Sequence, residues 1–168
     1  MISLYLEQHD TGRYFLHEHH LNATSWQLRR MADLMAMPGV ELAHGDRCQS
    51  GAVPGRGKNK GCPIMKPQGF LTISPALAEV LSRRCTGEHG ECSQPGGGRH
   101  TPCSGRNASD AAVYPRGLCR AIIKGTVEQL RLDHLLKEGC YGVQVADDDA
   151  AVAASMMGPD QGYSGKYR

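Results

Sequence analysis

The sequence predicts an α/β fold, and two observations carry that prediction. Short apolar runs rich in β-forming residues alternate with segments in which apolar residues recur every three or four positions. Their order along the chain is strand, helix, strand, loop, strand, helix, helix, which is half of an α/β sandwich. We expect one partial α/β domain over residues 1–138, with long irregular loops at about 49–65 and 86–110, and a low-order tail over 139–168.

The first half of this domain is predicted to hold two helices and two strands. A helical segment covers residues 1–9, and the apolar run 14–16 follows it as a strand. Thr24 and Gln27 fit a capping box, in which the threonine hydroxyl accepts a hydrogen bond from a free amide while the glutamine reaches back. A helix should therefore begin there, and a short strand over 40–43 should follow it.

The second half should contribute one strand and two helices. The run 69–73 is compact, apolar and rich in β-formers. Ser74 then offers a capping hydroxyl directly before a proline, which is a strong helix start. Pro115 opens the longest predicted helix, whose apolar stripe continues to about Lys137.

Four polar residues follow the first predicted strand: His17, Glu18, His19 and His20. Ligands of open α/β sheets bind at the carboxyl ends of strands, so this segment is predicted to border an active site. A solvated strand end is the alternative. Strand alternation places His17 and His19 on one face and Glu18 and His20 on the other, which favours pairs of ligands over a complete metal site.

The net charge of +2 is unevenly distributed. Between Arg47 and Arg131 there are thirteen lysines and arginines against five acids, while both ends of the chain are acidic. A basic segment of this kind is typical of a protein that contacts a polyanion, and the alternative is a flexible loop kept soluble by its charges. The residues predicted to contact nucleic acid are Arg47, Arg56, Lys58, Lys60 and Lys66.

Seven cysteines, an odd number without a secretory signal, favour thiols or metal ligands over disulfides. Five candidate ligands occur in the pattern Cys85-x3-His89-x2-Cys92 and His100-x2-Cys103, and four of the five could surround a zinc ion. We predict Cys85, His89, Cys92 and Cys103 as that set. Alternatively, Cys85 is the buried end of a helix and His89 a surface residue. Cys48 is a candidate nucleophile, although the sequence offers it no neighbouring base.

The chain has no apolar run near the ~20 residues that a membrane span needs, and no signal peptide at its start. We therefore expect a soluble intracellular protein without a membrane partner.

Six motifs occur in order along the chain: Gly12-Arg-Tyr-Phe-Leu-His-Glu-His19, Ala23-Thr-Ser-Trp26, Gly45-Asp-Arg-Cys48, Lys66-Pro-Gln-Gly-Phe-Leu-Thr72, Arg84-Cys-Thr-Gly-Glu-His89 and Tyr114-Pro-Arg-Gly-Leu-Cys119. Together they resemble a segment of Copia-like retrotransposon polyproteins (retrovirus-related Pol) of protists such as dinoflagellates. That segment is distantly similar to the C-terminal half of DNA cytosine-5 methyltransferases. The resemblance covers about residues 1–132 and implies a partial Rossmann-like fold.

The resemblance assigns Glu18 to a strand-end glutamate that, in active cytosine methyltransferases, hydrogen-bonds the target base. The half that would bind AdoMet lies upstream in that family, so the implied function is a methyltransferase-like fragment, inactive alone, whose partners are the other polyprotein domains. The implied alternative is a nucleic-acid-binding, zinc-pinned module of the same polyprotein. This chain departs from the pattern at His20, where the family has proline, and at Gln68, where it has threonine.

Overall fold

The computed structural model describes residues 1–136, and the low-order tail predicted over 139–168 lies outside that range. The described chain is mixed α/β, with one three-stranded sheet. Its strands are β1 (Leu16–His20), β2 (Glu41–Asp46) and β3 (Pro67–Thr72), and its helices are α1 (Ile2–Asp10), α2 (Arg29–Met35), α3 (Pro75–Leu81), α4 (Arg106–Asp110) and α5 (Arg116–Leu132). Two 3-10 turns, η1 (Thr24–Gln27) and η2 (Arg47–Ser50), precede α2 and follow β2.

The sheet has the order β1-β3-β2, and β3 pairs antiparallel with both neighbours. Thr72 lies opposite Leu16 on one side and Glu41 on the other. A Rossmann-like sheet is largely parallel, with helical crossovers between its strands. The Rossmann-like arrangement implied by the resemblance is therefore not confirmed, whereas the mixed α/β class is.

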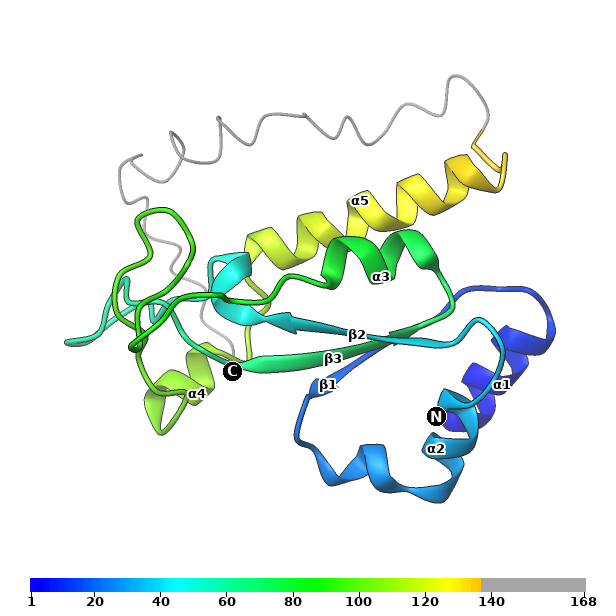
Figure 1. Ribbon diagram of the computed structural model, residues 1–168, viewed down its shortest axis with the longest axis horizontal. Coiled ribbons are helices and arrows are strands. Elements are labelled where there is room, and N and C mark those ends of the chain that lie inside the picture. The colour runs from blue at the N-terminus through cyan, green and yellow to red at the C-terminus, as the bar shows by residue number, and fades with distance from the viewer. Residues whose placement is uncertain (137–168) are drawn as a thin grey trace, which may run out of the picture. The chain divides into compact units, whose positions relative to one another are not determined.

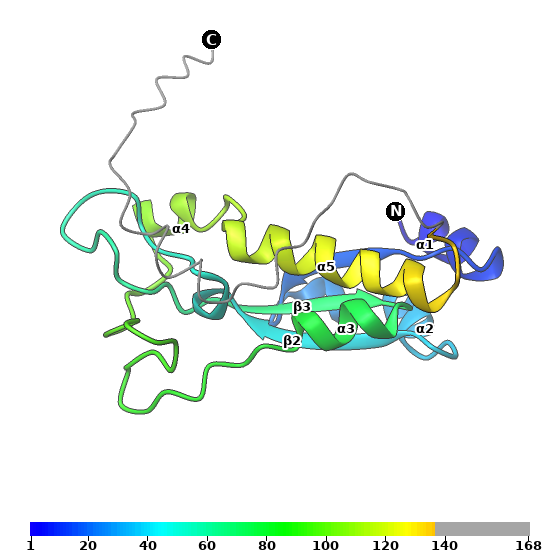
Figure 2. The same cartoon turned by 90° about the horizontal axis from the view of Figure 1, so that it is seen from above.

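Helices cover both faces of the sheet (Figure 1). Neighbouring residues of β3 point to opposite faces, so Phe70 joins the core beneath α3 and α5 while Leu71 joins the core beside α1 and α2. The first core contains Leu77, Leu81 and Leu118, and α3 and α5 run side by side above it (Figures 1 and 2). Both helices are thereby fixed to the sheet by burial of apolar side chains.

Two predicted helix starts are confirmed. Ser74 precedes α3 and its Oγ accepts a hydrogen bond of 3.2 Å from the amide of Leu77, while Pro115 directly precedes α5. Gln129 of α5 joins the two helices, because its Oε1 accepts from Ser74 Oγ at 2.8 Å. Gly125 lies where α5 packs tightly against α3, since a Cβ there would be 2.7 Å from Val80 Cγ2.

Three local predictions were wrong. β1 begins at Leu16, so the histidines lie within the strand and do not follow it. No capping box forms at Thr24, because residues 24–27 make a 3-10 turn that Trp26 holds in place by donating from Nε1 to the carbonyl of His20 at 2.8 Å. The helix α4 lies inside the predicted loop 86–110.

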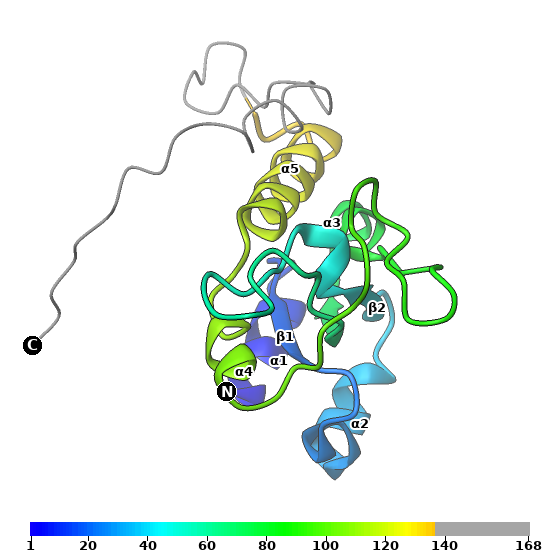
Figure 3. The same cartoon turned by 90° about the vertical axis from the view of Figure 1, so that its left-hand side faces the viewer.

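Segments from three parts of the chain gather at one end of the sheet (Figure 3). They are η2 with the loop that follows it, the connection between α3 and α4, and α4 itself. The first two are joined where Ile64 pairs with Thr101, whose amide donates to the carbonyl of Pro63 at 2.8 Å. None of the helices in residues 1–136 combines the length and the apolar character that crossing a membrane requires.

Candidate metal centre

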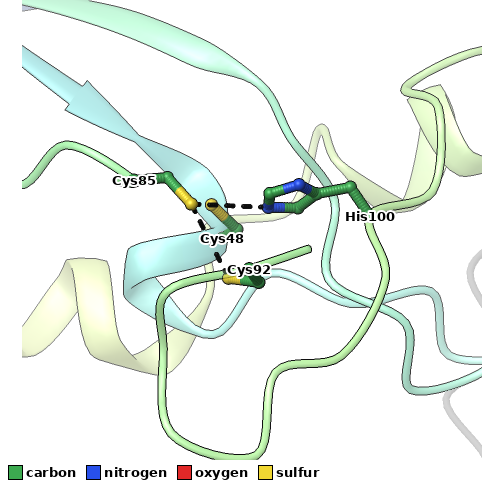
Figure 4. Close-up of side chains that lie close together, drawn as sticks. All are labelled: Cys48, Cys85, Cys92 and His100. Carbon is green, nitrogen blue, oxygen red and sulfur yellow. Dashed lines mark hydrogen bonds between the residues drawn. The ribbon is translucent and has the colours of Figure 1, made fainter. Parts of the chain in front are cut away.

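Three cysteines and one histidine meet at this end of the sheet (Figure 4). They are Cys48, Cys85, Cys92 and His100, whose ligand atoms all lie within 4.8 Å of one another. The Sγ atoms of Cys85 and Cys92 are 4.0 Å apart, and Cys85 Sγ is 3.6 Å from Nε2 of His100. The usual zinc bond lengths in a tetrahedron give edges of about 3.8 Å between two sulfurs and about 3.6 Å between sulfur and nitrogen. The four side chains could therefore hold a metal ion.

Cys48 forms the buried side of the cluster. It lies on η2, directly after β2, and has no exposed surface. Burial raises the pKa of its thiol to about 12. The side-chain amide of Gln49 lies between two ligands, with Nε2 3.7 Å from Cys48 Sγ and 3.5 Å from Cys92 Sγ. The turn η2 at the end of the sheet thus supplies one buried ligand, and the three ligands from the connection between α3 and α4 are more exposed.

Asp46, the last residue of β2, positions Cys85. Its buried carboxylate accepts from the amide of Cys85 at 2.8 Å and from Nε of Arg84 at 2.9 Å. The backbone of Asp46 also donates to the carbonyl of Arg83 at 2.8 Å. The segment after α3 is therefore held against the end of β2, which brings Cys85 next to Cys48.

A short hairpin supplies Cys92 and His100. The amide of Cys92 donates to Gly98, and that of His100 to Gly90, both at 2.8 Å. The turn between them passes so close to Cys92 that a Cβ on Gly97 would lie 2.8 Å from its Cβ. Only glycine fits this approach without a shift of the turn.

Cys85 Sγ accepts hydrogen bonds from both donors of Ser93, the amide at 3.4 Å and the hydroxyl at 3.5 Å. Burial raises the pKa of this thiol. The hydrogen bonds from Ser93 and from the backbone of Gly87 lower that pKa by more than burial raises it, and the resulting pKa is about 6. Donors arranged around a sulfur stabilise the thiolate, which is the form that binds a metal.

The connection between α3 and α4 has no apolar core of its own. Residues 82–105 contain no Val, Ile, Leu, Met, Phe, Tyr or Trp, yet three of the four clustered side chains come from this segment. A segment this poor in apolar residues gains little from burial, and a metal ion can supply the missing stabilisation. The composition of the segment therefore fits a bound ion.

The ligand set differs from the predicted one in two positions. Cys85 and Cys92 belong to the cluster, but His89 does not, and its side chain is 93% exposed. Cys103 packs against Ala52, Ile64 and Ala111 in a small separate core. Cys48 and His100 lie in the cluster where His89 and Cys103 were predicted. His100 was among the five candidates, whereas the only signal for Cys48 was its position directly after a strand.

The predicted nucleic-acid residues divide into two groups. Arg47 is 2% exposed, so the prediction that it contacts a polyanion was wrong. Its guanidinium donates from Nε to Gln68 Oε1 and from Nη1 to the carbonyl of Val113, both at 2.8 Å, and lies 4.9 Å from the ring centre of Tyr114. The other predicted residues lie in the loop before β3: Arg56, Lys58 and Lys60 are exposed and Lys66 is partly exposed.

Glu18 has protein partners for both carboxylate oxygens. Gln68 Nε2 donates to one, and the hydroxyl of Tyr114 donates to the other at 2.7 Å. These bonds join β1 and β3 to the segment before α5. A nucleobase would have to displace one of them to reach the carboxylate, so the geometry gives Glu18 a structural role.

The two alternate histidines of β1 share a face, as predicted. The rings of His17 and His19 both lie against Trp26, at centre distances of 5.3 and 6.3 Å. Tyr5 and the Nδ1 atom of His17 are joined by a hydrogen bond of 3.0 Å. Burial, and secondarily the nearby His19, lower the pKa of His17.

A cavity between β2, β3, α3 and α5 has room for about one water molecule. Gly45, Phe70 and Leu118 are among its lining residues. A cavity of this size does not admit a substrate.

The chain matches no protein-family model, no curated protein and no solved structure.

Proposed function

We propose that this chain is a zinc-stabilised interaction module that contacts nucleic acid through basic loops. The single observation that carries the proposal is the Cys48, Cys85, Cys92 and His100 cluster. Thiolates and imidazole are the ligands that zinc prefers, and a tetrahedral site of three sulfurs and one nitrogen is typical of structural zinc.

The zinc has a structural role in this proposal. Catalytic zinc sites keep one coordination position open for water or substrate, whereas the four protein side chains gathered here would occupy all four positions of a tetrahedral ion. The ion joins η2 to the connection between α3 and α4, and that connection has no large apolar residue of its own. Zinc binding then contributes directly to the stability of this end of the molecule.

Exposed basic residues near the metal centre support contact with nucleic acid. Arg83 and Arg99 are exposed on the connection that carries three ligands, and Arg56, Lys58 and Lys60 are exposed on the neighbouring loop. The Ile64 and Thr101 pairing joins these two segments. Phosphate contacts of this kind give affinity without reading base sequence.

The zinc proposal is tested by the metal content of matched variants. The full chain, purified without chelator, is expected to hold about one zinc per molecule by elemental analysis. Cys48→Ser and His100→Ala should lose the zinc and melt at a lower temperature. Cys103→Ser and His89→Ala remove the same residue types outside the cluster and should keep the metal. Wild-type protein without zinc, or loss of zinc from the control variants, would contradict the proposal.

The methyltransferase-like alternative stays a prediction. It would make the chain a fragment of a mobile-element polyprotein that is inactive alone, and Glu18 would be its base-contacting residue. Calorimetry with AdoMet at millimolar concentration distinguishes the two functions. The zinc-stabilised module predicts no binding, because residues 1–136 contain no glycine-rich turn between a strand and a helix start that could receive the cofactor. A clear one-to-one isotherm would favour the alternative.

A further inference from the structure

Two of the three clustered thiols differ from the third in access and in origin. Cys85 and Cys92 are partly exposed, their Sγ atoms are 4.0 Å apart, and only six residues separate them in one connection. Cys48 has no exposed surface, and its thiol contacts Met65 Sδ at 3.8 Å. A small oxidant that arrives from solvent therefore reaches Cys85 and Cys92 before Cys48.

The surroundings of Cys85 also provide a proton donor. The hydroxyl oxygen of Ser93 accepts from the amide of Thr86 and from Nε2 of Gln49, both at 3.1 Å. A hydroxyl has two acceptor positions and one donor, so these bonds leave its hydrogen directed at Cys85 Sγ, 3.5 Å away. A group that bonds to this sulfur therefore comes within reach of the same hydrogen.

We propose that Cys85 and Cys92 form a redox-modification site, at which hydrogen peroxide converts the two thiolates into a disulfide and releases the zinc. The inference rests on the proposed zinc centre. It goes beyond that function, because it makes the basic loops near the centre responsive to an oxidant.

The reaction balances in two steps. The Cys85 thiolate attacks one peroxide oxygen, the O–O bond breaks, and Cys85 becomes a sulfenic acid while hydroxide leaves and takes a proton to form water. The Ser93 hydroxyl lies where it can assist that proton transfer. The Cys92 thiolate then attacks Cys85 Sγ, the S–O bond breaks, and a second hydroxide leaves as water. Two thiolates, one peroxide and two protons give one disulfide and two waters.

Loss of the ion separates the hairpin from the sheet. A disulfide sulfur is a poor metal ligand, so Cys48 and His100 alone would retain zinc weakly. The connection that carries Arg83 and Arg99 then loses its attachment to η2. Peroxide should consequently weaken binding to nucleic acid, and a thiol reductant with added zinc should restore it.

The test uses the zinc-loaded full chain, hydrogen peroxide and a zinc-sensitive dye. Release of one zinc per chain is expected, with the Cys85 and Cys92 disulfide identified by mass spectrometry of peptides. Ser93→Ala keeps all four ligands and should slow release about tenfold, which corresponds to losing one hydrogen bond at the reacting sulfur. Ser104→Ala changes an exposed serine of the same connection and should release zinc at the wild-type rate.

Each other outcome has a distinct meaning. Zinc that stays bound while the exposed thiol of Cys119 is already oxidised would overturn the redox site and leave the zinc centre intact. A disulfide that includes Cys48, or equal release rates for the two serine variants, would also overturn it. A chain that holds no zinc before peroxide is added would overturn the proposed function itself.

Discussion

Arg47 Nε donates a hydrogen bond of 2.8 Å to Oε1 of Gln68 inside the protein. The same guanidinium bonds the carbonyl of Val113 and contacts the ring of Tyr114, whose hydroxyl bonds Glu18. Burial lowers the pKa of Arg47, and the nearby charge of Glu18 opposes that shift. One buried cation thus joins η2, β3 and the segment before α5.

Replacing Arg47 by methionine keeps most of the side-chain volume but removes its charge and donors. Gln68 Oε1 and the Val113 carbonyl would lose their partners, so the free energy of unfolding should fall by about 2–4 kcal/mol. Urea denaturation of the zinc-loaded protein measures the change. Arg56→Met alters an exposed arginine and should stay within about 0.5 kcal/mol of wild type. Equal effects of the two substitutions would contradict a structural role for Arg47.

The salt dependence of DNA binding should separate the two groups of basic residues. Contacts to about three to five phosphates give a slope of log K against log salt of roughly −2.7 to −4.5 on duplex DNA. Replacing Arg56, Lys58 and Lys60 together by alanine should flatten the slope by up to about 2.7 units. Arg47→Met should leave the slope unchanged, because that side chain is buried. A wild-type slope near zero would show that the exposed cations only solvate the loop.

Stability should fall as the pH drops below neutrality, and His17 should account for part of that loss. The pKa of His17 is lowered in the fold from its usual value of about 6.5, so the unfolded chain binds the proton first. The neutral ring contributes its full stabilisation above the unfolded-state pKa of about 6.5. That stabilisation is lost as the pH falls from there through the lower pKa of the folded state.

His17→Phe should remove this contribution. The free energy of unfolding, measured from pH 8 to pH 5, should therefore depend less steeply on pH in the variant than in wild type. Protonation of zinc ligands affects both proteins alike, so the difference between the two curves isolates His17. Parallel curves would mean that this histidine titrates normally in the fold.

Gly125 provides a test of the packing between α3 and α5 in which the sign of the effect is informative. Helix propensity alone would make Gly125→Ala stabilising by about 1 kcal/mol. The new Cβ would lie 2.7 Å from Val80 and 3.0 Å from the backbone of Leu77, so we expect a loss of about 1–3 kcal/mol. Gly55→Ala, where a Cβ meets no atom within 4 Å, should be close to neutral. A more stable Gly125 variant would contradict the packing described here.

The sequence predicted correctly those features of the fold, such as helix starts, that depend on interactions between neighbouring residues. Ser74 and Pro115 predicted the starts of α3 and α5 correctly, because capping and a fixed proline φ act within one helical turn. The turn at Trp26 was misjudged because its geometry depends on contacts with β1. The antiparallel pairing of the strands could not be predicted from local sequence either, because contacts between strands far apart in the chain determine it.

The Cys48, Cys85, Cys92 and His100 cluster was predicted only in part for the same reason. Cys85, Cys92 and His100 are close in sequence, so their spacing drew attention to them. Cys48 lies 37 positions before Cys85, and only the approach of Asp46 to the segment after α3 brings the two together. The burial of Arg47 could not be predicted from the sequence either, because nothing local distinguishes it from the exposed cations that follow it.

The most direct test of the zinc centre is X-ray absorption spectroscopy at the zinc edge on the purified full chain. Three sulfurs at about 2.3 Å and one nitrogen at about 2.0–2.1 Å are expected, with imidazole scattering from His100. In Cys48→Ser any zinc that remains should lose one sulfur, whereas Cys103→Ser should give the wild-type spectrum. A shell of oxygen and nitrogen only, or four sulfurs, would contradict the Cys48, Cys85, Cys92 and His100 site.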